Sequence, residues 1–192
     1  MPKVFVLILI FLFAFSVLAQ TSDLPDAGLA PDSPLYFLKN WKESIQTFFT
    51  FGAENKAKQY LHLAEVRLAE YQKMVEKGKT EIAQKTLEKY EKQLNHALEK
   101  LNQAKQQGRD VGQVLEKVSE ATQKHQEILL KVYEKVSEQA KKGIENALQK
   151  SLQGYEKAIE SVGKEKKETL ENQLQQQKQK IKEKTGLKLK EE

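Results

Sequence analysis

The sequence contains no cysteine and very little proline. Without cysteine there can be no disulfide, so packing alone must stabilise the folded chain. No proline follows Pro34, which is typical of long helices because proline breaks helix interiors. Alternating runs of Val, Ile and Thr are also missing, as are the Asn-Gly and Asp-Gly pairs of tight hairpins. These absences predict an all-α fold.

Arrangements of residues that carry out catalysis are also missing. Beyond residue 19 there are only four Asp; three precede the first predicted helix, and the fourth, Asp110, stands where a later helix begins. Glu residues alternate with Lys at the spacing of helix pairs, as in Glu88 and Lys92, which indicates solvated faces. The sequence has no Gly-rich phosphate loop, nucleophile elbow or Walker lysine. We therefore expect no enzymatic activity and no cofactor.

Three histidines are present, His62, His96 and His125, and none has the Glu three residues earlier that a di-iron bundle would require. His125 lies among the apolar positions of a predicted helix. We interpret it as a histidine at the edge of the core, bonded to a neighbouring side chain, because metal ligands occur in clusters. No metal site is expected.

The N-terminus has the pattern of a secretory signal over residues 1–19. A short positive start precedes an apolar run of 15 residues, and Val17-Leu18-Ala19 suits a signal peptidase that cleaves before Gln20. The alternative is an uncleaved anchor, although a spanning helix needs about 20 residues. We predict an exported protein, periplasmic, extracellular or at the cell surface.

The net charge of the chain is only mildly positive. Loss of Lys3 with the signal would lower the formal net charge from +5 to +4. Because this excess lies on a mixed Lys/Glu surface, we predict no nucleic-acid partner.

The remaining chain divides into four parts by composition and periodicity. Residues 20–32 combine proline and glycine with little apolar periodicity, and we interpret them as a flexible leader. A helical bundle domain is predicted for residues 33–136, followed by a C-terminal helix over 137–163. Residues 164–192, with nine Lys and six Glu, form a low-complexity helical tail.

Within the bundle domain, helices are predicted over residues 34–50, 53–77, 81–107 and 110–136. In the last three, apolar residues recur at alternating spacings of four and three, the heptad pattern of coiled coils. These seam positions are Ala57, Leu61, Ala64, Leu68, Tyr71 and Val75, then Ala83, Leu87, Tyr90, Leu94, Ala97, Leu101 and Ala104, then Val118, Thr122, His125, Leu129, Val132 and Val136. Gly78 and Gly108 are natural helix stops, and connections that short make successive helices antiparallel. We expect an antiparallel three-helix unit with the segment 34–50 packed against it.

The tail has only a narrow apolar stripe, formed by Leu170, Leu174 and Ile181. This pattern predicts a solvated, charge-balanced helix that frays at Gly186. The alternative is an arm that makes weak contacts with membrane headgroups or anionic envelope polymers.

Several segments resemble a known family. The opening Pro31-Asp32-Ser33-Pro34-Leu35-Tyr36-Phe37-Leu38-Lys39 is similar to that of domain of unknown function 5667, which occurs in exported bacterial and archaeal proteins. The similarity continues at residues 61–70 and 122–129, and covers roughly residues 28–135. Relatives often carry proline where this chain has Glu138, which implies a helix boundary there. The resemblance implies an exported helical domain and no assigned activity.

The segment 34–50 and its flank concentrate the aromatic residues that follow the predicted signal. The four Phe that follow residue 19 and the single Trp lie within 15 residues: Phe37, Trp41, Phe48, Phe49 and Phe51. Together with Leu35, Leu38 and Ile45 they cover roughly 200° of a helix, about twice the usual core-facing stripe. Either this helix forms the heart of the core, which we expect because buried aromatics dominate small cores, or part of the arc is an exposed interaction surface.

Two classes of function remain. The leading hypothesis is a non-enzymatic helical-bundle protein of the cell envelope that binds a protein partner, self-associates or acts as a scaffold. The alternative is an extracytoplasmic holdase-type chaperone that holds unfolded chains, or a binder of anionic polymer or membrane through the Lys-rich tail.

Overall fold

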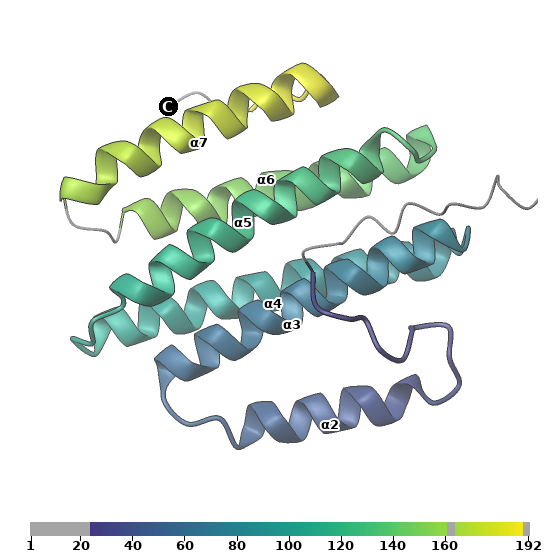
Figure 1. Cartoon of the computed structure of the whole chain (residues 1–192), viewed down its shortest axis with the longest axis horizontal. Helices are drawn as coiled ribbons and strands as arrows, with labels where there is room; N and C mark the ends of the chain where they lie inside the picture. The colour runs from purple at the N-terminus through teal and green to yellow at the C-terminus, as the bar shows by residue number, and fades with distance from the viewer. Residues whose placement is uncertain (1–23, 161–163, 190–192) are drawn as a thin grey trace, which may run out of the picture.

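The computed structural model describes residues 24–160 and 164–189, and within them it consists of helices and connecting segments without a strand (Figure 1). The all-α prediction is confirmed. The helices are α2 (Tyr36–Phe48), α3 (Ala53–Glu76), α4 (Thr80–Gln106), α5 (Gly112–Tyr133), α6 (Glu138–Ile159) and α7 (Lys164–Thr185). The predicted signal, residues 1–19, lies outside the described residues.

The two predicted glycine stops end α3 and α4. Gly78 and Gly108 have φ angles of 67° and 72°, which lie in the left-handed region that glycine enters without steric cost. After α3, the Lys79 amide donates to the Met74 carbonyl at 2.9 Å, so a carbonyl of the last turn is satisfied. Arg109 and Ala104 repeat this geometry after α4 at 3.2 Å. Both turns therefore follow from local sequence.

Two antiparallel hairpins, α3/α4 and α5/α6, pack together so that α3 lies beside α5 and α4 beside α6 (Figure 1). The expected unit of three helices is therefore incomplete, because α6 belongs to the same core. Ile144, Leu148 and Tyr155 of α6 are completely buried. The segment 134–137 separates α5 from α6, and α6 begins at Glu138, the position where the family resemblance implied a boundary.

The seam positions lie in this core. Those of α4 and α5 are all buried, and those of α3 are buried except for Val75. Val75 and Val136, which lies just after α5, pack against the core while partly exposed. Before α2, Leu24 and Ala30 join the same apolar cluster. The periodicity therefore predicted the buried faces; regular heptad interdigitation stays a prediction.

The tail helix α7 packs on α5 and α6 instead of standing in solvent. Leu174 and Ile181 are buried, so the narrow apolar stripe is enough to dock the helix. Ion pairs flank the stripe: Lys178 lies 2.7 Å from Glu156, and Lys180 lies 3.2 Å from Glu127. Most other side chains of the tail stay exposed, as predicted for a solvated, charge-balanced helix, but the apolar stripe docks this helix on the bundle, which was not expected. The helix ends at Thr185, next to Gly186, as predicted.

Helix α2 forms an outer layer on the side of the bundle opposite α7, and its packing partner is α3 (Figure 1). Gly52, with a φ of 84°, makes the turn between α2 and α3. The two segments that we singled out for binding, the aromatic helix and the Lys-rich tail, therefore lie on opposite sides of the molecule.

Candidate interaction surface

The face of α2 that meets α3 is polar. Tyr36, Lys39 and Glu43 follow one another at spacings of three and four, so they share one side of the helix. On α3, Arg67 and Glu70 are three residues apart and lie opposite them, and both are buried. Two short helical segments thus bring five polar side chains together, which we call the buried polar cluster.

Glu70 is the centre of the cluster and has no exposed surface. Its Oε2 accepts a hydrogen bond from the Tyr36 hydroxyl at 2.7 Å, and both of its oxygens lie 2.7 Å from Arg67 Nη1. Lys39 Nζ forms an ion pair with the same carboxylate, and Arg67 Nη2 forms one with Glu43. Two cations and two anions balance, which is the condition under which buried charges are tolerated.

The titration of the cluster follows from this geometry. Burial, followed by the hydrogen bond to Glu70, raises the pKa of Tyr36, so its hydroxyl stays a neutral donor. Burial lowers the pKa of Arg67, but the neighbouring Glu70 more than offsets this, and the net pKa is raised. Lys89 of α4 lies 4.9 Å from the centre of the Tyr36 ring, where burial and then the Arg67 charge lower its pKa. At neutral pH, Tyr36 is therefore a neutral donor and Arg67 a cation within the cluster.

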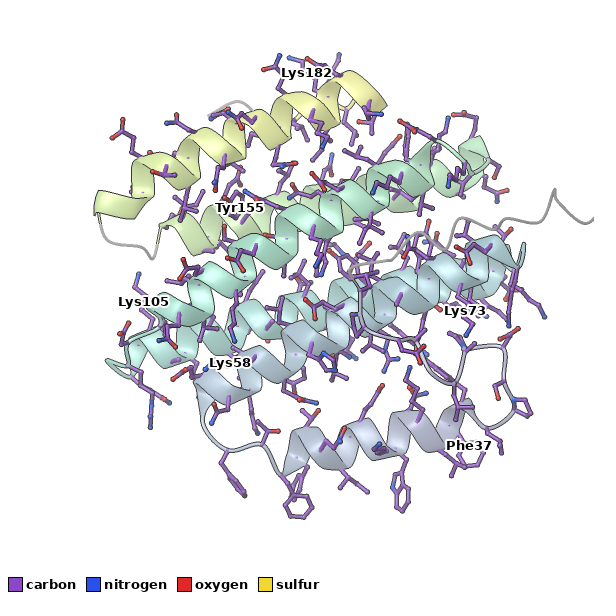
Figure 2. All side chains as sticks on the ribbon, in the orientation of Figure 1. Phe37, Lys58, Lys73, Lys105, Tyr155 and Lys182 are labelled. Atoms are coloured by element: carbon purple, nitrogen blue, oxygen red, sulfur yellow. The ribbon has the colours of Figure 1, made fainter. Side chains whose placement is uncertain are left out.

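The opposite face of α2 is apolar and points away from the bundle. Figure 2 shows a row of aromatic rings on the outer side of the helix. Phe37, Trp41, Phe48, Phe49 and Phe51 are between 62% and 77% exposed. Leu35, Leu38 and Ile45 are exposed beside them. We call these eight side chains the aromatic face.

The expectation that the aromatic helix would form the heart of the core is wrong. The chain contains a second set of side chains, the buried polar cluster, that fixes the other face of α2 against α3. Turning the aromatic face inward would take Tyr36, Lys39 and Glu43 away from the Arg67–Glu70 pair. These two buried groups would then keep only each other as partners, at a cost of several kcal/mol. Sequence reasoning missed this cluster because Lys39/Glu43 and Arg67/Glu70 each resemble ordinary surface pairs within one helix.

A second polar group lies in the middle of the four-helix core. His125 is completely buried, and its Nδ1 lies 3.2 Å from the Tyr90 hydroxyl. Its neighbour Gln126 donates a hydrogen bond from Nε2 to Ser151 Oγ at 3.2 Å, which links α5 to α6. The predicted bond to a neighbouring side chain is thus present, although His125 lies deep in the core and not at its edge. Burial lowers the pKa of His125 to about 4, from an ordinary value of 6.5.

We predict that the stability of the protein falls as the pH is lowered from about 6.5 to about 4. The unfolded chain binds a proton at His125 near pH 6.5, whereas the folded chain binds it only near its pKa of about 4. The stabilisation is therefore complete above pH 6.5 and is lost on acidification, by about 3 kcal/mol at 1.36 kcal/mol per pKa unit. Urea unfolding at a series of pH values measures it.

The control for this effect is His125→Gln, which has no titratable group. Other groups titrate over the same range in both proteins, so the difference between the two curves isolates His125. Parallel curves for the two proteins would contradict the assignment.

Neither a metal centre nor a membrane-spanning helix is apparent in the part of the chain that the structure describes. Over residues 24–160 and 164–189, no three His, Asp or Glu side chains are grouped so that they could hold a metal ion. Within the same residues, no helix combines the length and apolar character needed to cross a bilayer. A groove of about 270 Å³ between α3 and α5 is lined by side chains of both charges, including Lys58, Glu65 and Glu120.

Comparison with known families extends this description. A family model described as "Domain of unknown function (DUF5667)" matches residues 28–139, more than half of the chain. The chain belongs to this family. The DUF5667 region spans α2 to α5 and ends just inside α6, so in this protein the domain completes its core with a helix that lies beyond the matched residues. Neither the curated proteins nor the solved structures gave a match.

The buried polar cluster joins the two longest segments in which the DUF5667 resemblance was found. Tyr36 and Lys39 belong to the opening segment, residues 31–39, and Arg67 and Glu70 belong to residues 61–70. Residues that are about thirty positions apart thus meet through hydrogen bonds and an ion pair. This contact is what orients α2.

Proposed function

We propose that this DUF5667 protein is an exported, non-enzymatic helical-bundle protein of the cell envelope that binds another protein through its aromatic face. The observation that carries the proposal is the orientation of α2, which has its charged face buried and its apolar face in solvent. Ordinary amphipathic helices have the reverse orientation. The protein buries four charged side chains and exposes five aromatic rings. Exposed apolar patches of this kind usually mark interaction sites, so we infer that a partner covers these rings.

The extent of the surface supports the proposal. Aromatic side chains contribute about 150–250 Å² each, so five of them at this exposure present roughly 700 Å². The largest apolar patch of a typical monomer is about 300–600 Å² and is often functional. The buried polar cluster also holds the helix in one orientation, so little ordering entropy is lost on binding. Aromatic side chains in a rigid setting are the usual anchors of protein interfaces.

Trp41 tests this proposal because it is the only tryptophan of the chain. We expect Trp41 of the free monomer to emit at long wavelength and to be quenched freely by iodide, and to become protected when partner is added. Trp41→Ala should change the free energy of unfolding by less than about 1 kcal/mol, because the side chain is 65% exposed, but should weaken binding by about 2 kcal/mol or more.

The matched control is Gln175→Ala, an exposed change on α7 at the opposite side of the molecule. It should alter neither stability nor binding. A loss of several kcal/mol of stability in Trp41→Ala with unchanged binding would show that the tryptophan is structural.

Export is supported by the N-terminal sequence alone. We expect the mature protein recovered from outside the cytoplasm to begin at Gln20, because the signal pattern places cleavage after Ala19. Intact-mass measurement checks this directly. Recovery of protein that retains residues 1–19 from the membrane fraction would contradict cleavage and indicate an anchored protein.

A holdase-type chaperone is the second candidate, since an exposed apolar face would also hold unfolded chains. The two differ in breadth: a dedicated interface binds one partner tightly, whereas a holdase binds many unfolded chains weakly and suppresses their aggregation. Binding of anionic polymer by the tail has less support. Lys178, Lys180 and Lys184 of α7 form ion pairs with glutamates of α6, of α5 and of the segment after α5, which lowers the positive charge available for a ligand.

A further inference from the structure

We propose that the partner of the aromatic face is a second copy of this chain, and that two α2 helices pair antiparallel across a two-fold axis. This inference rests on the proposed function, because it requires that the aromatic face binds protein. It adds the identity and geometry of the partner. The bundles of the two copies would then lie on opposite sides of the α2 pair.

The area of the aromatic face fits such a dimer. Five aromatic side chains present roughly 700 Å² and Leu35, Leu38 and Ile45 extend the patch further. A stable interface of standard size buries about 800 Å² on each partner. The aromatic face therefore supplies the area of a whole dimer interface, and no additional surface of the bundle is required.

The apolar positions of α2 also match across an antiparallel pair. Apolar residues lie in pairs about Glu43, and the two members of each pair are equally far from it along the chain. The pairs are Phe37 and Phe49, Leu38 and Phe48, and Trp41 and Ile45. If the two-fold axis passes at the level of Glu43, each of these side chains lies level with its counterpart on the other copy. Apolar side chains then meet along the whole helix.

The direction of pairing follows from size and dipoles. Phe48, Phe49 and Phe51 cluster at the C-terminal end of α2 and just beyond it, whereas Leu35 and Leu38 lie beside Phe37 at the N-terminal end. An antiparallel pair places Phe48 of one copy level with Leu38 of the other and Trp41 level with Ile45, so large and smaller side chains alternate at these levels, which favours close packing. It also sets each helix dipole beside one of opposite direction. A parallel pair would crowd the phenylalanines at one end.

The charges of α2 favour protein over lipid. The helix has three charged residues, and two of them, Lys39 and Glu43, are used in the buried polar cluster. Lys42 is the remaining one and is exposed. Interfacial helices that bind anionic membranes usually carry several basic residues on their polar face, whereas here that face is turned into the bundle.

The experiment measures mass and Trp41 fluorescence together. The chain is purified in the processed form that the host delivers, and a dilution series over about a thousandfold range is followed by light scattering and by emission. We expect a dimer at high concentration with Trp41 emission shifted to the blue, and a monomer with red emission on dilution. The change in mass and the shift in Trp41 emission should have their midpoints at the same protein concentration.

Variants locate the interface. Ile45→Glu places a charge at the centre of the pair and should raise the dissociation constant by about 100-fold or more, with unchanged far-UV circular dichroism. Gln175→Glu adds the same charge on α7 and should leave the dimer intact. Because the chain has no cysteine, Ser44→Cys on α2 should crosslink through a short bismaleimide, whereas Gln175→Cys should not.

Three results would overturn the proposal. A dimer that persists in Ile45→Glu would place the interface elsewhere. A monomer with red emission at every concentration would exclude the second copy; protection of its Trp41 by a different purified envelope protein would then leave the proposed function standing. Protection by vesicles of phosphatidylglycerol, with a monomer throughout, would make the face a lipid contact and remove both proposals.

Discussion

Glu70→Ala should lower the free energy of unfolding by about 3–5 kcal/mol, the usual cost of removing one partner from a buried ion pair. The substitution leaves the Arg67 and Lys39 cations without the carboxylate that they share, in a site where Glu70 itself has no exposure to water. It also removes the acceptor of the Tyr36 hydroxyl. Urea unfolding followed by far-UV circular dichroism measures the loss.

A double variant separates the charge effect from the loss of volume. Arg67→Met with Glu70→Leu replaces one cation and one anion by apolar side chains of similar size, and it leaves Lys39 and Glu43, 3.9 Å apart, to pair with each other. Such replacements are often neutral, so most of the lost stability should return. Glu99→Ala, at an exposed position of α4, is the surface control and should cost less than about 0.5 kcal/mol. A Glu70→Ala protein as stable as this control would contradict the role of the cluster.

The same change should release α2. The helix meets the bundle mainly through α3, and the buried polar cluster supplies the contacts that fix its orientation. In Glu70→Ala we therefore expect amide exchange in α2 to quicken more than in α3. Uniform acceleration through the whole chain would mean that the cluster stabilises the bundle and does not specifically hold α2.

Truncation of Leu68, Leu94 or Leu129 to Ala should cost about 2–5 kcal/mol each. The three side chains come from α3, α4 and α5, and none has any exposed surface. Each substitution removes buried carbon atoms and leaves a cavity that close-packed neighbours fill only in part. Thermal or urea unfolding of the three single variants checks the prediction.

The matched control is Leu29→Ala, which removes the same atoms from a side chain that is 43% exposed and should change stability by less than about 1 kcal/mol. Near-neutral effects at two of the three buried leucines would mean that the seam positions do not form the core.

Local sequence was sufficient for the helices and their buried faces. Gly78 and Gly108 end helices because glycine alone adopts the left-handed conformation without strain, and this property does not depend on distant residues. The seam positions are buried because a helix can hide only one stripe, and spacings of four and three mark that stripe in the sequence. The resemblance of residues 31–39 and 61–70 to DUF5667 was likewise readable from the chain.

Neighbour relations between helices required the tertiary structure. The short connection after Gly108 predicted the relative direction of α4 and α5. It did not show that the packing neighbours of α4 are α3 and α6. Periodicity shows which face is buried and not which helix covers it, so the place of α6 in the core was missed. The docking of α7 was missed for a similar reason: the sequence shows its apolar stripe, Leu174 and Ile181 included, but not the helices that cover this stripe.

The sequence by itself determined that the chain is all-α, where most of its helices end, and that an aromatic arc of unusual width lies on the first of them. Only the tertiary structure decided that this arc faces solvent. The physical reason is that the buried pair Glu70 and Arg67, on another helix, takes its remaining partners from the polar face of α2, and an inward aromatic face would remove them.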